Sequence, residues 1–183
     1  LMLFEDSILI QASCAEVYAF FEAIDQNYLR WHPDHILFSW RKGKGLQEGN
    51  VFYFEEFILE EKLAKETRFT RIIPNRYIEF QVTNWFYRFF LPKMTFCFQP
   101  AEEQRGEVMG PQESCIFTAQ VFLRDVGPLG RYLHRKEFAA VRQHMKEEGL
   151  HLKALIEKGH LPRPSSELHF LEPNRVTELY VES

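Results

Sequence analysis

The alternation of apolar and polar residues predicts a strand, a helix, a sheet and a second helix in that order. Residues 7–12 form a short β-rich run. Apolar side chains then recur at helical spacing over residues 13–24, with Ser13 as a typical N-cap and Glu16 three residues later. The period changes to two between residues 36 and 124, which is typical of strands. It returns to the helical value over residues 129–158, and Gly159 is a typical helix end.

Six strands are expected in the middle of the chain, after a short helix or turn over residues 28–35. They cover residues 36–41, 50–59, 62–73, 76–83, 92–99 and 113–124. The connections between neighbours are short, as at Glu60–Glu61 and at the turn Pro74–Asn75, and residues 104–112 read as a polar hairpin loop. Short connections favour an antiparallel meander over parallel strands with crossover helices.

This order of elements resembles the helix-grip fold of the START-like superfamily. That fold is of the α+β class, with a curved antiparallel sheet of about seven strands wrapped around a long C-terminal helix and a cavity between them. We therefore expect one helix-grip domain over residues 5–159. The mostly polar residues 160–183 contain three prolines and are expected to form a C-terminal tail.

The composition favours a soluble protein with a substantial core. Of the 183 residues, 45% are hydrophobic and 15% are aromatic, and such rings either fill a core or line a cavity for a flat ligand. A net charge of −4 argues against nucleic-acid binding. No apolar run reaches the ~18–20 residues of a membrane span, and no signal peptide is evident, so a cytoplasmic protein is expected. Three cysteines without CxxC spacing indicate neither a disulfide framework nor a thiolate metal site.

Two metal-ligating side chains lie on or beside the apolar face of the predicted long helix. On a helical wheel of about 100° per residue, Glu148 falls inside the apolar arc that contains Met145 and Leu152, and His144 falls at its edge. A carboxylate directed into a core is costly unless it is paired or binds a cation. His144 and Glu148 are one turn apart, so they could form half of a metal site or a plain ion pair on the helix.

Further candidate ligands occur in two other places. The segment YLRWHPDHI over Tyr28–Ile36 contains His32 and His35, either of which could face the cavity. On the strand over residues 50–59, Glu56 shares a face with apolar side chains. The next strand contains Glu66, but its alternation does not decide which face points inward.

The segment YLRWHPDHI, the strand GNVFYFEEF, the pair ETRFTRIIPNRYIEF and the late helix with HMKEE resemble the 2,4-diacetylphloroglucinol hydrolase and phloretin hydrolase family, over roughly residues 5–158. Members have a helix-grip catalytic domain with one zinc ion bound by two His and two Glu. They cleave the carbon–carbon bond between a phenolic ring and its acyl group. Placed by spacing, the resemblance implies four zinc ligands: His35, Glu66, His144 and Glu148. His32 is the alternative to His35, and Glu56 is the alternative to Glu66.

The resemblance also implies roles for Tyr28 and His32, which could hydrogen-bond the substrate phenols or protonate the departing aryl carbon. The expected partner is a hydrophobic or phenolic small molecule, and a homodimer is a possible assembly. The chain is short, without room for an additional N-terminal domain, so the substrate stays open. The alternatives are a metal-free carrier, with His144 and Glu148 as a polar anchor, and a cyclase or aromatase-like enzyme that uses acid and base residues in the same cavity.

Overall fold

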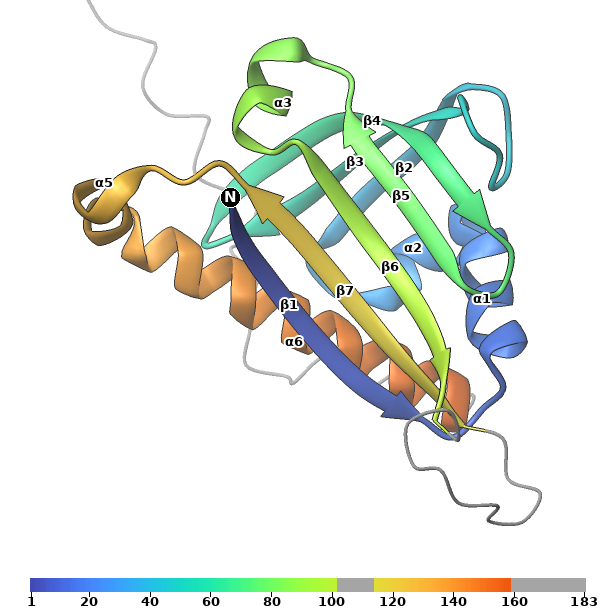
Figure 1. The fold of residues 1–183 in the computed structure, drawn as a ribbon. Coiled ribbons are helices and arrows are strands. Elements are labelled where there is room, and N and C mark those ends of the chain that lie inside the picture. Colours follow the sequence, from blue (N-terminus) through green and yellow to red (C-terminus); the bar gives the residue numbers. More distant parts are fainter. Residues whose placement is uncertain (102–113, 159–183) are drawn as a thin grey trace, which may run out of the picture.

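The computed structural model describes residues 1–101 and 114–158, and its centre is a seven-stranded antiparallel sheet (Figure 1). The strand order is β1-β7-β6-β5-β4-β3-β2, so strands that follow one another along the chain are mostly neighbours, and β1 closes one edge against β7. The strands are β1 (Met2–Ile10), β2 (His35–Lys42), β3 (Val51–Ile58), β4 (Glu61–Ile73), β5 (Tyr77–Val82), β6 (Lys93–Pro100) and β7 (Cys115–Leu123).

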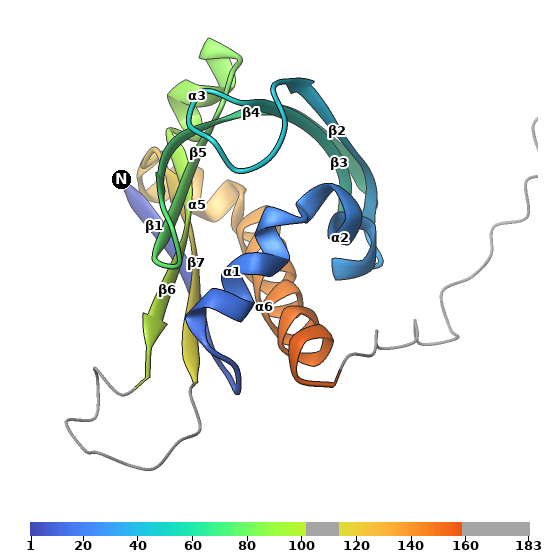
Figure 2. The same cartoon turned by 90° about the vertical axis from the view of Figure 1, so that its right-hand side faces the viewer.

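Helices α1 (Cys14–Glu22), α2 (Ile24–Trp31) and α6 (Arg135–Lys158) lie on the concave side of this sheet, which curves over them in Figure 2. The long C-terminal helix α6 packs along β1, and α2 packs against β2. The remaining helices are α3 (Trp85–Phe90) and α5 (Gly127–Leu133). The predicted α+β architecture, a curved antiparallel sheet around a long C-terminal helix, is confirmed.

Helix boundaries depart from the prediction in two places. The expected single helix over residues 129–158 is divided at His134, whose backbone N–H bonds back to Gly130 and closes α5 before α6 begins. The short helix α3 was not predicted; Asn84 caps it by accepting hydrogen bonds from the backbone of its first turn. The expected loop over residues 104–112 and the expected tail over residues 160–183 lie outside the described residues.

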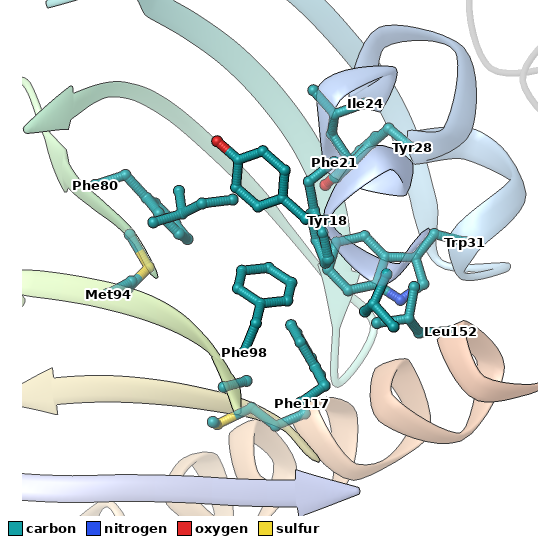
Figure 3. Close-up of a cluster of buried hydrophobic side chains, with 14 of the residues drawn as sticks. Tyr18, Phe21, Ile24, Tyr28, Trp31, Phe80, Met94, Phe98, Phe117 and Leu152 are labelled. Atoms are coloured by element: carbon teal, nitrogen blue, oxygen red, sulfur yellow. The ribbon is translucent and has the colours of Figure 1, made fainter. Parts of the chain in front are cut away.

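The core between the sheet and the helices is aromatic (Figure 3). Phe21 on α1 stacks on Phe117 of β7 with ring centroids 5.5 Å apart, and meets Trp31 of α2 edge-on at 5.4 Å. Leu152 of α6 is completely buried, and Met145 is 5% exposed, as the helical wheel predicts. This cluster anchors α6 to the sheet and so holds the helix that carries His144 and Glu148.

Cys14 and Cys115 form a disulfide between the first turn of α1 and the start of β7, with Cα atoms 5.0 Å apart. The expectation that no disulfide is present was therefore wrong. The two cysteines are separated by 101 residues, so their spacing gave no indication that the fold brings them together. No described helix combines the length and the apolar character that a membrane span requires.

Candidate metal centre and cavity

Four metal-ligating side chains converge where α6 crosses the ends of β2 and β3. His35, Glu56, His144 and Glu148 each offer a ligand atom, and these atoms all lie within 4.8 Å of one another. His35 Nε2 is 3.0 Å from Glu148 Oε1 and 3.8 Å from Glu56 Oε2. His144 Nε2 is 3.8 Å from Glu56 Oε2 and 3.9 Å from Glu148 Oε1.

Local structure explains this convergence. His32 ends α2 in an extended conformation, as expected before Pro33, and the turn that follows is closed by the His35 N–H bonding to the His32 carbonyl. This turn puts His35 directly opposite Glu56 in the β2–β3 pair. His144 and Glu148 come from adjacent turns of α6, so both side chains extend from the same face.

The residues present fit a zinc ion. Ligand atoms at about 2.0–2.1 Å from a tetrahedral zinc are about 3.3 Å apart, close to the separations observed between the imidazole nitrogens and the carboxylate oxygens. His35 Nδ1 lies 2.8 Å from the Tyr28 carbonyl oxygen, so it donates there and leaves Nε2 free to bind a cation. Buried His144 Nε2 has no hydrogen-bond partner in the described chain. The charges of Glu56 and Glu148 would balance a divalent ion.

Glu66, which was expected as a zinc ligand, does not join this group of four side chains. Glu66 pairs with Tyr53 across β3 and β4, on the face opposite to Glu56. Its side chain is exposed and accepts a hydrogen bond of 2.8 Å from Thr83 Oγ1. The alternative, Glu56, supplies the strand carboxylate, and its position on a face with buried phenylalanines was the sequence signal for it.

Tyr28 and Trp31 on α2 hold the centre in place. The Tyr28 ring stacks on His35 with centroids 4.0 Å apart, and its hydroxyl donates a 3.2 Å hydrogen bond to Glu56 Oε2. Burial and the negative charge of Glu56 raise the pKa of Tyr28, so the phenol stays protonated. Trp31 Nε1 donates to the Glu148 carbonyl oxygen at 2.9 Å, which joins α2 to α6.

His32 lies on the side of the centre away from the cavity, and it forms a second possible metal-binding group with His35 and His144, whose ligand atoms all lie within 4.8 Å of one another. Its ring centroid is 4.5 Å from that of His144 and 4.8 Å from that of His151. His32 Nδ1 accepts from the Asp34 N–H, and its Nε2 is 3.5 Å from Glu147. His151 and Glu147, which do not line the cavity, therefore lie beside His32.

The buried histidines titrate in opposite directions. Burial lowers the pKa of His32 to about 3, and the neighbouring imidazoles of His144 and His35 act in the same direction. Burial alone would lower the pKa of His144 too, but the carboxylates of Glu56 and Glu148 outweigh it and raise that pKa to about 9. In the metal-free site the two carboxylates thus stabilise a positive charge on protonated His144, as they would stabilise a bound cation.

A cavity of about 500 Å³ opens in front of the centre, between the sheet and α6. Tyr28, Glu56, His144 and Glu148 form part of its wall, whereas His32 does not line it. Six phenylalanines of the sheet also line it, together with aliphatic side chains: Phe38, Phe52, Phe54, Phe69, Phe80 and Phe96. Part of the aromatic content of the chain therefore lines a space beside the four ligands.

Comparison with solved structures places this architecture among known folds. The KanY protein matches with a TM-score of 0.59 and 13% identity over 85% of this chain and 97% of that chain. Truncated norcoclaurine synthase from Thalictrum flavum matches with a TM-score of 0.57 and 8% identity, over 86% and 94%. The chain has the Bet v 1-like helix-grip fold.

Other helix-grip structures also match this chain. The di-domain ARO/CYC BexL from the BE-7585A biosynthetic pathway matches with a TM-score of 0.56 and 17% identity. The match covers 89% of the present chain and 51% of the BexL chain. No family model matches the chain, and no curated protein matches its sequence. The solved structures therefore establish the fold, and the reaction stays a prediction.

The stability of the metal-free chain should be greatest near pH 6.5. The raised pKa of His144 gives a contribution that is complete below about 6.5 and is lost as pH rises toward about 9. The lowered pKa of His32 has the opposite effect. As pH falls from about 6.5 toward 3, the imidazole is protonated in the unfolded chain but not in the native state, so the native state loses stability. Denaturation midpoints measured against pH in chelator should show both declines.

Zinc should remove the alkaline decline, because the ion replaces the proton on His144. Replacing the exposed His134 by glutamine is the control and should leave the profile unchanged. An alkaline decline that persists at saturating zinc would contradict the assignment of His144.

Proposed function

We propose that this chain is a zinc-dependent hydrolase that cleaves the carbon–carbon bond between a phenolic ring and its acyl group. The observation that carries the proposal is the convergence of two imidazoles and two carboxylates at the wall of an aromatic cavity. The ligand set supported by the geometry is His35, Glu56, His144 and Glu148. The resemblance to the hydrolase family supplies the reaction.

The residues of the site suit that chemistry. A bound zinc ion would polarise the acyl carbonyl as a Lewis acid. In the overall reaction water adds to the acyl carbon, the bond to the ring breaks, the acyl group leaves as a carboxylic acid and the ring carbon gains a proton. Tyr28 lines the cavity and stays protonated, so it is the candidate that orients the substrate or donates that proton. His32 lies behind His144, which favours a positioning role over direct contact with the substrate.

The aromatic wall supports a flat ligand. The phenylalanines from β2 to β6 offer ring faces and edges for stacking on a phenolic substrate. The same wall would also suit the alternative functions, a carrier or a cyclase, and one of the similar structures is an ARO/CYC protein. These alternatives need no metal, so metal content separates them from the hydrolase.

Protein purified without chelator should contain one zinc ion per chain and release a carboxylic acid from a monoacylated phloroglucinol. Chelation should abolish both, and added zinc should restore both. The measurements are elemental analysis and chromatography of the two products. Zinc content well below one per chain, together with no effect of zinc on stability, would contradict the proposal and favour a metal-free carrier.

A further inference from the structure

Lys65 lines the aromatic cavity and is half-buried there, whereas Lys62 and Lys136, which also line it, are exposed. Lys65 on β4 pairs with Phe54 on β3, and both side chains line the cavity. Leu63 and Phe69, on the same face of β4, line it too. Because side chains alternate along a strand, this inner face is separate from the outer face that carries Glu66.

The ammonium group of Lys65 has no close partner. Within residues 1–101 and 114–158 it makes no hydrogen bond and no ion pair. Burial lowers its pKa, and the charge of Glu56 raises it at longer range. By contrast Lys62, at the start of β4, is paired with Glu55 at 2.6 Å. An ammonium facing apolar walls without a partner is costly, and a bound anion would remove that cost.

The position of Lys65 relative to the metal centre limits the size of the ligand. Phe54 and Glu56 are two residues apart on one face of β3, so they are about 7 Å apart along the strand. Lys65 is directly opposite Phe54, and its flexible side chain adds further reach. One aromatic ring with a substituent on each side spans such a distance. Phe54, which lies beside Lys65 and lines the cavity, would contact the ring.

We propose that the cavity binds an aromatic molecule with an anionic oxygen, which Lys65 binds while an acyl carbonyl faces the metal centre. The inference rests on the proposed function, since it takes the cavity as the substrate site. The anion comes from a carboxylate or from an ionised phenol, and both place a negative oxygen on an aromatic ring. Lys65 thereby selects acidic over neutral aromatic ligands.

Fluorescence titration with two probes tests this role in the presence of chelator. Anilinonaphthalene sulfonate carries an anionic group, and N-phenylnaphthylamine has the same rings without it. Lys65→Met should weaken binding of the anionic probe about tenfold, equivalent to about 1.4 kcal/mol, and should leave the neutral probe within about twofold. Lys65→Arg should retain the anionic probe. Lys42→Met removes an exposed charge away from the cavity and should change neither.

Competition against the anionic probe identifies the source of the anion. Para-acetylbenzoate is ionised throughout the neutral range, whereas para-hydroxyacetophenone ionises only as pH is raised, and acetophenone stays neutral. Stronger displacement by the benzoate at neutral pH, lost in Lys65→Met, supports a carboxylate. Displacement by the phenol that grows with pH in the same Lys65-dependent way supports an ionised phenol. Equal displacement by all three, or equal weakening of both probes in Lys65→Met, would overturn the proposal.

Zinc content and thermal unfolding complete the experiment. Lys65→Met should bind as much zinc as the unmodified chain and should unfold cooperatively, so a failed fold is distinguished from a lost anion contact. Because the probe titrations contain chelator, their result does not depend on zinc. A chain without zinc that still discriminates between the two probes would contradict the hydrolase while supporting the role of Lys65.

Discussion

Replacing Glu56 by glutamine should weaken zinc binding at least about a hundredfold and abolish zinc-dependent cleavage of acyl phenols. The substitution keeps the size of the side chain and can keep the hydrogen bond from Tyr28. It removes one of the two negative charges that would balance the ion, and an amide is a poor zinc ligand. Glu148→Gln should have the same effect, because Glu148 lies 3.0 Å from His35.

Glu66→Gln is the matched control, since it makes the same chemical change on the neighbouring strand. Glu66 is exposed on the outer face of the sheet, so this variant should retain its zinc and its activity. Zinc titration by calorimetry and elemental analysis measure the difference. Full zinc content in Glu56→Gln combined with loss of zinc in Glu66→Gln would show that Glu66, the residue expected from spacing, is the ligand from the sheet.

Leu152→Ala should destabilise the chain by about 2–5 kcal/mol, because it creates a cavity among aromatic rings. Leu152 is completely buried against the aromatic cluster that Figure 3 shows. Leu150→Ala makes the same change on the same helix, but Leu150 is 50% exposed. Its cost should be within about 0.5 kcal/mol.

Urea denaturation of the metal-free proteins gives both free energies of unfolding, and unchanged m-values would show that the two variants can be compared. Equal costs for the two substitutions would mean that α6 presents a different face to the sheet. The positions of His144 and Glu148 would then be wrong as well, because both are set by the rotation of this helix.

The sequence by itself determined the type and order of most elements. The period of apolar residues changes from helical to two and back, and such local patterns depend only on which face of each element is buried. The wheel of the last helix likewise placed His144 and Glu148 beside Met145 and Leu152, because residues within one helix have fixed angular relations. Both inferences depend only on the spacing of residues that are close together in the sequence.

The choice between Glu56 and Glu66 needed the tertiary structure. The inner face of β4 carries Lys65 and Thr67 among its apolar residues, so the strand has no clear alternation from which its orientation can be read. Only the register of β3 against β4 shows that Glu66 points outward. Spacing along the chain favoured Glu66, but distance in sequence carries no information about the face of a sheet.

Contacts between distant segments were also decided by the fold alone. Cys14 of α1 meets Cys115 of β7, and His32 at the end of α2 lies beside His151 of α6. Lys65 likewise faces the cavity with phenylalanines only because the sheet is curved, and its proposed contact with an anion depends on that position. The period of apolar residues indicates whether a side chain is buried. It does not indicate which residues that side chain contacts, because those contacts depend on strand register and helix placement over the whole chain.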